Sequence, residues 1–267
     1  MIEPAHIDDD RTALRAATPT GWLAEMFTTY QGEGPHVGKR QLFLRLGGCT
    51  IGCRYCDTPD ALRAGQRFEV RGAGPSAVAT HANPLDARTV ADLVHRAAAA
   101  EPALHAIAVT GGEPLEQARF LADLFPRLAP LPILLETAGT LPDELATIVR
   151  HVAIVSMDVK LPSVARTPDR FAAHRRFLEI ARTDRARDVY VKVIVNENVD
   201  DDEWLRAVQL VREVDASVPF VVQPETARRG ALAASFPLLA RLADTATREG
   251  LKDVRVIPQT HKFLGAP

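Results

Sequence analysis

The stretch Cys49-Thr-Ile-Gly-Cys53-Arg-Tyr-Cys56-Asp57 contains all three cysteines of this 267-residue chain. An odd number of closely spaced thiols does not form a disulfide framework, because loops this short cannot cross-link distant parts of a chain. Thiolate is the ligand that iron–sulfur clusters use, so three thiolates on one loop can hold three irons of a [4Fe–4S] cluster. The fourth iron would then stay open to a substrate or a cofactor.

The alternative for this loop is a structural zinc site made of the three cysteines and a distant histidine. Structural zinc sites usually combine two Cys-x-x-Cys pairs that lie apart in the sequence. No second pair exists here, since the chain has no other cysteine. The thiols therefore favour the cluster and leave a non-catalytic zinc-binding module as the other reading.

The length and composition are those of one globular α/β domain. A chain of 267 residues can bury a full core, and 46% hydrophobic and 25% charged residues are average values. The formal net charge of −2 gives no basic field, so we expect no nucleic-acid partner. No apolar run predicts a membrane span or a signal region. Reduced thiols and an iron–sulfur cluster are typical of the cytoplasm.

Two segments lack the periodicity of regular structure. Residues 1–20 are polar and contain Asp8-Asp9-Asp10, Pro4 and Pro19, which predicts a disordered N-terminal arm. Residues 61–84 are rich in Gly, Ala and Pro, which predicts a long loop or insertion with room for a short hairpin. The domain itself is expected over residues 21–267.

The remainder of the chain alternates between apolar runs and amphipathic segments. A buried strand at 41–46 leads into the cysteine loop. Later strands are predicted at 106–110, 133–136, 152–157, 189–195, 219–223 and 254–257. Helices are predicted at 86–100, 116–128, 142–149, 168–182, 201–213 and 232–248. This order predicts an incomplete TIM-like barrel with parallel strands and right-handed crossovers.

Polar residues gather where each predicted strand ends. In barrel-like parallel sheets the carboxyl ends of the strands share one face, and ligands bind there. We therefore expect one polar site, although each residue alone could merely cap the next helix. The residues are Thr110 and Glu113, Glu136 and Thr137, Ser156, Asp158 and Lys160, Lys192 and Asn196, and Gln223 and Glu225.

Two motifs together resemble the radical S-adenosylmethionine (SAM) superfamily. The first is the Cys-x3-Cys-x2-Cys spacing with aromatic Tyr55 before its last cysteine, and the second is Gly111-Gly112-Glu113-Pro114 after a predicted strand. The resemblance implies a radical SAM core in which SAM chelates the open iron and is cleaved to a 5′-deoxyadenosyl radical. The protein would then supply orientation and exclude side reactions.

Within that superfamily the chain resembles the 7-carboxy-7-deazaguanine synthases over roughly residues 22–267. The Gln31-Gly32-Glu33-Gly34 box, joined to the cysteine loop, is the most specific part, and Thr50 stands where the family usually has Asn. The other matching stretches are Tyr30, Gly38, Phe43, Arg45, Gly48-Cys49, Cys56-Asp57-Thr58, Thr110–Pro114, Glu136–Gly139, Asp158–Lys160, Gln223-Pro224 and Val256–Lys262.

The resemblance implies a reaction and its partners. The substrate would be 6-carboxy-5,6,7,8-tetrahydropterin and the product 7-carboxy-7-deazaguanine, with loss of ammonia, in 7-deazapurine (queuosine) biosynthesis. Mg²⁺ assists in this family with Thr58 as its protein ligand, which fits a cation that needs few protein oxygens. From the sequence alone, Thr58 could instead cap the following turn. A homodimer and a flavodoxin- or ferredoxin-like electron donor are implied as well.

The resemblance also implies a role for each site residue. Cys49, Cys53 and Cys56 would ligate the cluster. SAM would be held by Tyr55, Cys56, Asp57, Gly111, Gly112, Glu113, Ser156, Asp158, Lys160, Gln223, Pro224, Glu225 and Thr226. The substrate would be held by Tyr30, Gln31, Gly32, Glu33, Arg45 and Thr110. Arg45 suits the substrate carboxylate because its fork binds both oxygens, and Glu33 suits the N–H donors of the pterin edge.

The C-terminal carboxylate of Pro267 is a further candidate substrate ligand. The tail follows the predicted strand 254–257, and Phe263 and Leu264 could anchor it. A carboxylate is a permanent anion at neutral pH and matches the paired N–H donors of a pterin. Glu33 competes for this role, and a tail that merely packs on the surface is the alternative.

One rival lies within the same superfamily. A glycyl-radical-enzyme activase shares the cysteine spacing but acts on a protein partner, and the Gln31–Gly34 box argues against it.

Overall fold

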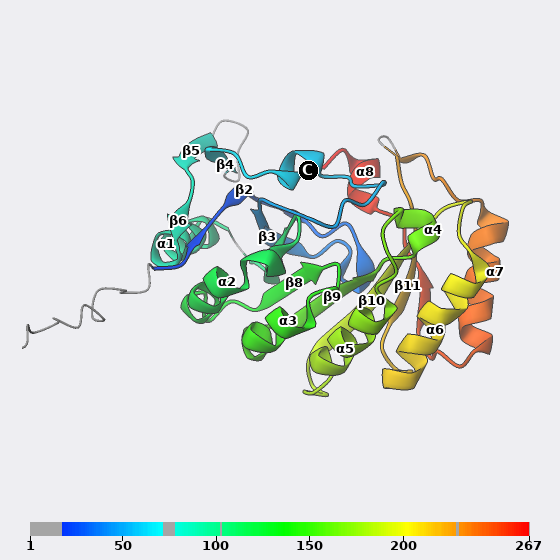
Figure 1. The fold of residues 1–267 in the computed structure, drawn as a ribbon. Coiled ribbons are helices and arrows are strands. Elements are labelled where there is room, and N and C mark those ends of the chain that lie inside the picture. The colour runs from blue at the N-terminus through cyan, green and yellow to red at the C-terminus, as the bar shows by residue number, and fades with distance from the viewer. Residues whose placement is uncertain (1–17, 72–77, 102, 228–229, 267) are drawn as a thin grey trace, which may run out of the picture.

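The computed structural model describes residues 18–71, 78–101, 103–227 and 230–266. Its centre is one ten-stranded sheet in the order β12-β11-β10-β9-β8-β7-β3-β2-β4-β5 (Figure 1). The strands are β2 (Leu23–Tyr30), β3 (Arg40–Leu46), β4 (Arg67–Arg71), β5 (Val78–Ala82), β7 (Ala106–Gly111), β8 (Ile133–Thr137), β9 (Ile154–Val159), β10 (Asp188–Val195), β11 (Phe220–Pro224) and β12 (Val254–Val256). Short strands β1 (Thr20–Gly21) and β6 (Leu85–Asp86) pair separately.

Strands β3 and β7 to β12 run parallel, which confirms the predicted α/β fold. The strand order ends at β12 on one side and at β5 on the other, so the barrel is open. Strand β2 is antiparallel to β3, and β4 pairs with β2 in parallel. The sequence indicated no direction for residues 23–30, because direction depends on which neighbour a strand meets rather than on its own periodicity.

The helices that connect the parallel strands cover one face of the sheet, where Figure 1 shows α2, α3, α5 and α6 in a row. Two of the longer ones begin at Asp caps: Asp86 accepts from Thr89 N at 2.9 Å, and Asp200 accepts from the amides of residues 202 and 203. The helices are α1 (Ala87–Ala99), α2 (Ala118–Leu124), α3 (Pro142–Ile148), α4 (Pro162–Ala165), α5 (Phe171–Ala181), α6 (Asp201–Asp215), α7 (Phe236–Arg248) and α8 (Thr260–Leu264). In the described part of the chain, no helix combines the length and the apolar character needed to cross a membrane.

The face of the sheet away from these helices changes from apolar to polar along each strand. Side chains two residues apart share a face, so Leu134 is followed by Glu136 on β8, and Ile154 by Asp158 on β9. The apolar half forms a small core in which the rings of Phe27 and Phe43 stack 5.3 Å apart. The polar half lies at the carboxyl ends of the strands, which is where the sequence predicted the site.

The segment 61–84 is more than a loop, because strands β4 and β5 form a hairpin that extends the sheet. Phe68 is 2% exposed and anchors this hairpin, and Asn83 exchanges two hydrogen bonds with the backbone of Leu23. The 3-10 helix η2 (Pro59–Leu62) occupies the start of the segment. The N-terminal arm expected over 1–20 is corrected at its end, because Thr20 belongs to β1; its residues 1–17 lie outside the described range.

Candidate active site

A cavity of about 430 Å³ opens at the carboxyl ends of the strands. Most of the residues predicted from the sequence line it. They are Tyr30, Gln31, Gly32, Glu33, Arg45, Cys49, Cys53, Tyr55, Cys56, Asp57, Thr58, Thr110, Gly111, Gly112, Asp158, Lys160 and Glu225. The structure therefore brings the cysteine loop, the Gly-Gly box and the Gln31–Glu33 loop to one cavity.

The cysteine loop presents three unpaired, half-buried thiols to this cavity. Neighbouring segments hold the loop: Thr50 donates to Glu116 Oε1 through both its amide (2.7 Å) and its hydroxyl (2.6 Å), and Arg54 N donates to Ala165 O at 2.9 Å. Burial raises the pKa of the Cys49 and Cys53 thiols. A bound metal would therefore have to stabilise the thiolates, which is the usual coupling between metal affinity and proton release.

The Gly-Gly box packs directly on the cysteine loop. Gly112 N donates to Leu46 O (3.1 Å), and Glu113 N donates to Gly48 O (3.0 Å). A Cβ at Gly112 would lie 2.1 Å from Gly48 O and 2.7 Å from Cys49 Cβ, so only glycine fits this close approach. Backbone atoms at the box thus lie beside the thiols, where a cofactor bound to a cluster would reach them.

Glu113 points away from the cavity. Its carboxylate is 1% exposed and accepts hydrogen bonds from Leu115 N (3.1 Å), Thr137 Oγ1 (2.7 Å) and Ala138 N (2.8 Å). Burial raises the pKa of Glu113 to about 7, although these three donors oppose the rise. The side chain therefore joins the end of β7 to the turn after β8.

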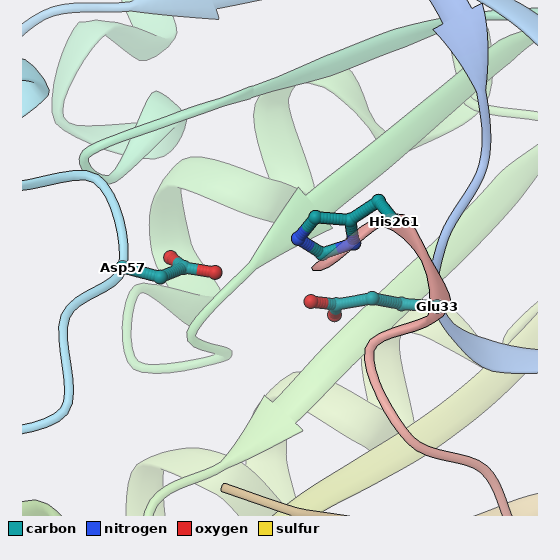
Figure 2. A group of neighbouring side chains, drawn as sticks. All are labelled: Glu33, Asp57 and His261. Carbon is teal, nitrogen blue, oxygen red and sulfur yellow. The ribbon is translucent and has the colours of Figure 1, made fainter. Parts of the chain in front are cut away.

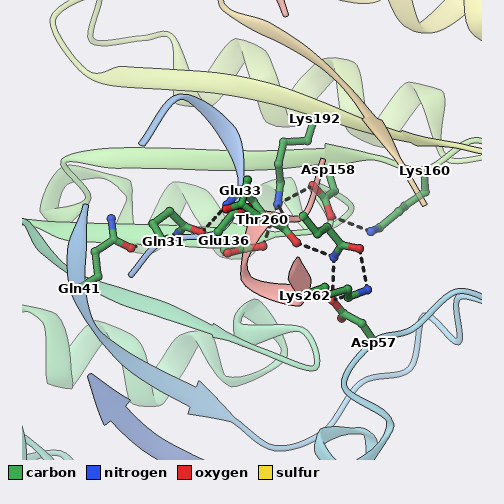
Figure 3. Close-up of polar contacts among 12 residues, drawn as sticks. Gln31, Glu33, Gln41, Asp57, Glu136, Asp158, Lys160, Lys192, Thr260 and Lys262 are labelled. Atoms are coloured by element: carbon green, nitrogen blue, oxygen red, sulfur yellow. Dashed lines mark hydrogen bonds and ion pairs between the residues drawn. The ribbon is translucent and has the colours of Figure 1, made fainter. Parts of the chain in front are cut away.

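Four charged side chains form a network under and beside the cavity (Figure 3). Lys192 forms ion pairs with Glu33, with Glu136 (2.8 Å) and with Asp158 (3.4 Å). Burial would raise the pKa of Glu33, but the charge of Lys192 and its hydrogen bond outweigh this and hold that pKa below its usual range. Burial raises the pKa of Glu136, and the nearby charge of Lys192 opposes this rise.

Lys160 approaches Asp158 from the other side. Its Nζ donates to Asp158 Oδ2 at 2.9 Å and lies 5.4 Å from the centre of the Tyr55 ring. The backbone of Lys160 is fixed by buried His174: Lys160 N can only donate, so His174 Nε2 accepts (3.2 Å) and Nδ1–H donates to Gly139 O (3.1 Å). Burial lowers the pKa of His174 to about 4, which keeps this tautomer neutral.

The segment around α8 reaches the cavity from the C-terminal end of the chain. Gln259 Nε2 donates to Glu33 Oε1 (2.7 Å) and to Asp57 Oδ2 (2.8 Å), while Lys262 Nζ donates to Gln259 Oε1 (2.6 Å). The ammonium of Lys262 needs an acceptor, and this fixes which end of the Gln259 amide faces the two carboxylates. Thr260 N donates to Gly32 O at 2.8 Å and completes the attachment.

Glu33, Asp57 and His261 point toward one another from three distant segments (Figure 2). Each offers one ligand atom within 4.8 Å of the others, a spacing that could suit a metal ion. The amide nitrogen of Gln259 already bonds both carboxylates, and Lys192 pairs with Glu33. Donors of the protein therefore bridge these acids.

Arg45 and Gln31 also line the cavity. Arg45 Nε donates to Glu25 Oε1 at 2.8 Å, and its guanidinium lies 5.6 Å from the centre of the Phe27 ring. Gln31 donates to Gln41 Oε1 (3.1 Å) and accepts from Glu33 N (3.0 Å), so its side chain shapes the loop. Arg45 therefore lines the cavity while its guanidinium is already paired with Glu25.

Thr58 lines the cavity beside Asp57. It is the residue before η2, but its side chain makes no capping hydrogen bond there. The capping interpretation of Thr58 therefore has no support in the geometry.

Some predicted site residues do not line the cavity, namely Glu113, Ser156, Gln223, Pro224 and Thr226. Ser156 Oγ and both amide atoms of Gln223 are buried and have no hydrogen-bond partner among the described residues. Pro267 lies outside the described range. The sequence analysis expected Glu136 and Lys192 at the polar site because they lie near strand ends, but it gave them no specific role. It assigned no role to Gln259, His261 or Lys262.

Comparison with known proteins first defines the class. The model of the Radical SAM superfamily matches residues 44–223, from the end of β3 to β11. Among solved structures, QueE from Escherichia coli aligns with a TM-score of 0.55 at 18% identity, covering 91% of this chain and 95% of that one. A radical SAM methyltransferase from Sphaerobacter thermophilus aligns with a TM-score of 0.56 at 17% identity, over 82% and 66% of the two chains.

Sequence relatives narrow the class. The 7-carboxy-7-deazaguanine synthase of Geobacter sulfurreducens is 38% identical over 92% of this chain and 98% of its own length. The enzyme of the same name from Archaeoglobus fulgidus is 31% identical over 91% and 97%. The chain belongs to the radical SAM superfamily and, within it, to the 7-carboxy-7-deazaguanine synthase family. That membership implies a [4Fe–4S] cluster and SAM, and three unpaired thiols beside an open cavity fit both groups.

Proposed function

We propose that this protein converts 6-carboxy-5,6,7,8-tetrahydropterin to 7-carboxy-7-deazaguanine with loss of ammonia, as a step of 7-deazapurine (queuosine) biosynthesis. One observation carries the proposal: a single cavity joins the three thiols, the Gly111-Gly112 box and the loop Gln31–Glu33. Relatives that carry the synthase name match nearly the whole chain. A zinc module would not require such a cavity, and an activase that acts on a protein would need its thiols and Gly-Gly box for SAM but not the loop Gln31–Glu33 beside them.

Cys49, Cys53 and Cys56 would hold the cluster, with SAM beside them. When bound, these groups supply a radical that removes a hydrogen atom from the substrate. The backbone at Gly112 gives acceptors for the SAM ammonium, and Tyr55, Asp57, Asp158, Lys160 and Glu225 frame the remaining cavity wall. The other residues assigned to SAM, namely Glu113, Ser156, Gln223, Pro224 and Thr226, do not line the cavity and would act on SAM through the residues that do.

The substrate would lie between Arg45 and Glu33. The guanidinium of Arg45 still has donors left after its bond to Glu25, and it can bind the substrate carboxylate through them. Glu33 is held as a carboxylate by Lys192, so it accepts hydrogen bonds from the N–H donors of the pterin edge. Tyr30, Gln31, Gly32 and Thr110 complete this side of the cavity.

Two further ligands belong to the proposal. Mg²⁺ would bind the Thr58 hydroxyl and oxygens of the substrate, with water in the other positions. The terminal carboxylate of Pro267 would meet the donor edge of the pterin; Ala266, the residue before it, lines the cavity and supports this placement. We further propose a homodimer that receives electrons from a flavodoxin- or ferredoxin-like donor in the cytoplasm.

Anaerobic reconstitution tests the proposal at its first step. We expect the wild-type protein to take up iron and sulfide, to absorb broadly in the visible range, and to bind the tetrahydropterin in a calorimetric titration with SAM present. The Cys53→Ala variant should lose the cluster, because two thiolates cannot hold three irons. A colourless protein that binds one zinc ion and no pterin would contradict the proposal.

A further inference from the structure

Lys192 lies beneath the cavity rather than in its wall. It stands in the middle of β10, its side chain is fully buried, and it is absent from the residues that line the cavity. Its neighbours on the strand, Val191 and Val193, belong to the apolar core on the helix side of the sheet. An isolated ammonium in such a place would be strongly unfavourable, so its partners must compensate its charge.

The partners of Lys192 come from three separate segments. Glu33 lies on the loop after β2, Glu136 on β8 and Asp158 on β9, and their carboxylates meet at the Lys192 ammonium (Figure 3). All three residues line the cavity, whereas Lys192 does not. Glu33 faces the proposed substrate, whereas Asp158 pairs with Lys160 on the proposed SAM side. The other titratable or charged groups that face this cluster are Tyr190, Tyr55, Cys53, Asp57, Lys160, His261 and Lys262.

We propose that Lys192 is a positioning residue for substrate recognition. From below the cavity it holds the carboxylates of Glu33, Glu136 and Asp158 in one arrangement, so that the cavity presents ionised acceptors to its ligand. The ligand class that these three carboxylates select is a flat heterocycle with adjacent N–H donors along one edge. This inference rests on the proposed function, because it assigns to Glu33 the donor edge of the pterin.

The arrangement depends on the charge of Lys192 and on a side chain long enough to bring that charge to all three carboxylates. Without the ammonium, the three acids would lie close together, and burial would favour their protonated forms. A protonated Glu33 carries a hydrogen where an acceptor is required, so the donor edge of the ligand would meet a donor. Lys192 never needs to touch the ligand to produce this effect.

The test compares Lys192→Gln, Lys192→Arg and the wild-type protein, each with its cluster reconstituted. Pterin and SAM affinities are measured separately by anaerobic calorimetry over the range from weakly acidic to alkaline pH. We expect Lys192→Gln to weaken pterin binding at neutral pH by about 10- to 100-fold, the usual loss for a misplaced charged hydrogen bond. The loss should shrink as the pH rises, because Glu33 then ionises, and SAM binding should change much less. Lys192→Arg should recover part of the pterin affinity.

A second readout is independent of the reaction and of the cofactors. In the apo protein at neutral pH, infrared spectroscopy should show more protonated carboxyl absorption in Lys192→Gln than in the wild-type protein, since the contribution of Glu113 is common to both. The double variant Lys192→Gln/Glu33→Gln should weaken that additional absorption. If Lys192→Gln does not fold, Lys192→Gln/Glu136→Gln removes one of the stranded acids and takes its place in both measurements.

Arg182→Met is the matched control, because Arg182 is a partly buried cation paired with Asp215 (2.7 Å) far from the cavity. It should lower stability without changing the pterin affinity or its pH dependence. A Lys192→Gln protein with wild-type pterin affinity, or with a pH-independent loss equal to that of the control, would overturn the inference. Failure of the proposed function looks different: the wild-type protein itself would then bind no pterin, while the infrared result would still report on the charge arrangement.

Discussion

Arg45 carries two interactions whose geometry a lysine cannot reproduce. Its Nε bonds Glu25, and its guanidinium plane lies near the Phe27 ring while the side chain lines the cavity. We expect Arg45→Lys to keep the charge but to lose the two-pronged guanidinium. The loss of transition-state stabilisation should be about 1–3 kcal/mol, which lowers kcat/KM roughly 5- to 150-fold. Steady-state kinetics checks this, and Glu25→Gln separates loss of the support from loss of the fork. An unchanged KM in Arg45→Lys would make Arg45 a structural residue.

Glu113 makes a prediction about stability and pH. Its pKa of about 7 in the folded protein lies above the ordinary value of 4.5, so the folded state binds the proton more tightly than the unfolded state. The stabilisation is therefore present below pH 4.5 and is lost as the pH rises through 7. We expect the free energy of unfolding of the wild type, relative to Glu113→Gln, to fall by about 3 kcal/mol between pH 4 and pH 8. Urea unfolding of both proteins measures it, and a pH-independent difference would show that Glu113 stays ionised.

Thr58 tests the proposed Mg²⁺ site. Its hydroxyl makes no capping bond, so Thr58→Val keeps the shape and removes only an oxygen ligand. We expect the variant to lose the stimulation of turnover by Mg²⁺ while its iron content stays at the wild-type level. Serial addition of Mg²⁺ to the chelated enzyme provides the measurement, and an undiminished response would exclude Thr58 as the ligand.

The side chains that the sequence revealed are those with a chemical signature of their own. Three cysteines on one loop predict a metal site directly, and Arg45 stands out as a charged residue in the apolar run of a predicted strand. Lys192 carried the same signal, but its role depends on acids at positions 33, 136 and 158 that only the fold brings together. Glu113 shows the opposite case, since its motif indicated a ligand while its carboxylate turns toward residues 137 and 138.

Among the elements, α8 and the residue before it connect parts of the site that are far apart in the sequence. Gln259 bonds Glu33 and Asp57, and Lys262 donates to Thr226 O at 2.7 Å. This short helix therefore links the proposed substrate loop, the cysteine loop and the segment after β11. Nothing in a five-residue helix predicts these contacts, because they follow from where β12 ends.

Gln259→Leu should loosen this link. Two charge-assisted hydrogen bonds are lost, one to the buried carboxylate of Glu33 and one to the exposed carboxylate of Asp57, so we expect KM for the pterin to rise about tenfold, with iron content unchanged. Leu264→Ala on the same helix is the matched control, since Leu264 is 74% exposed and makes no part of the link. Equal KM values for Gln259→Leu and Leu264→Ala would contradict this prediction and would leave α8 with no role in substrate binding.

At the scale of the molecule, the alternation of strands and helices was sufficient to predict the parallel half of the sheet. The sequence left room for a short hairpin within 61–84, but it predicted neither the pairing of that hairpin with the sheet nor the antiparallel β2, because β-pairing joins residues such as Glu25 and Glu69 that share no local pattern. Strand β2 is antiparallel to β3, so the proposed substrate loop after β2 begins beside Arg40 at the start of β3, whereas the cysteine loop follows the end of β3. The two loops therefore reach the cavity from opposite ends of this strand pair.

Anaerobic turnover tests the central claim most directly. The reconstituted protein is mixed with 6-carboxy-5,6,7,8-tetrahydropterin, SAM, Mg²⁺ and a reductant, and the products are separated and identified by mass. We predict that 7-carboxy-7-deazaguanine and ammonia form in equal amounts, and that the Cys53→Ala protein forms neither. A wild-type protein that carries a full cluster and cleaves SAM, yet yields no deazaguanine from this pterin, would contradict the account.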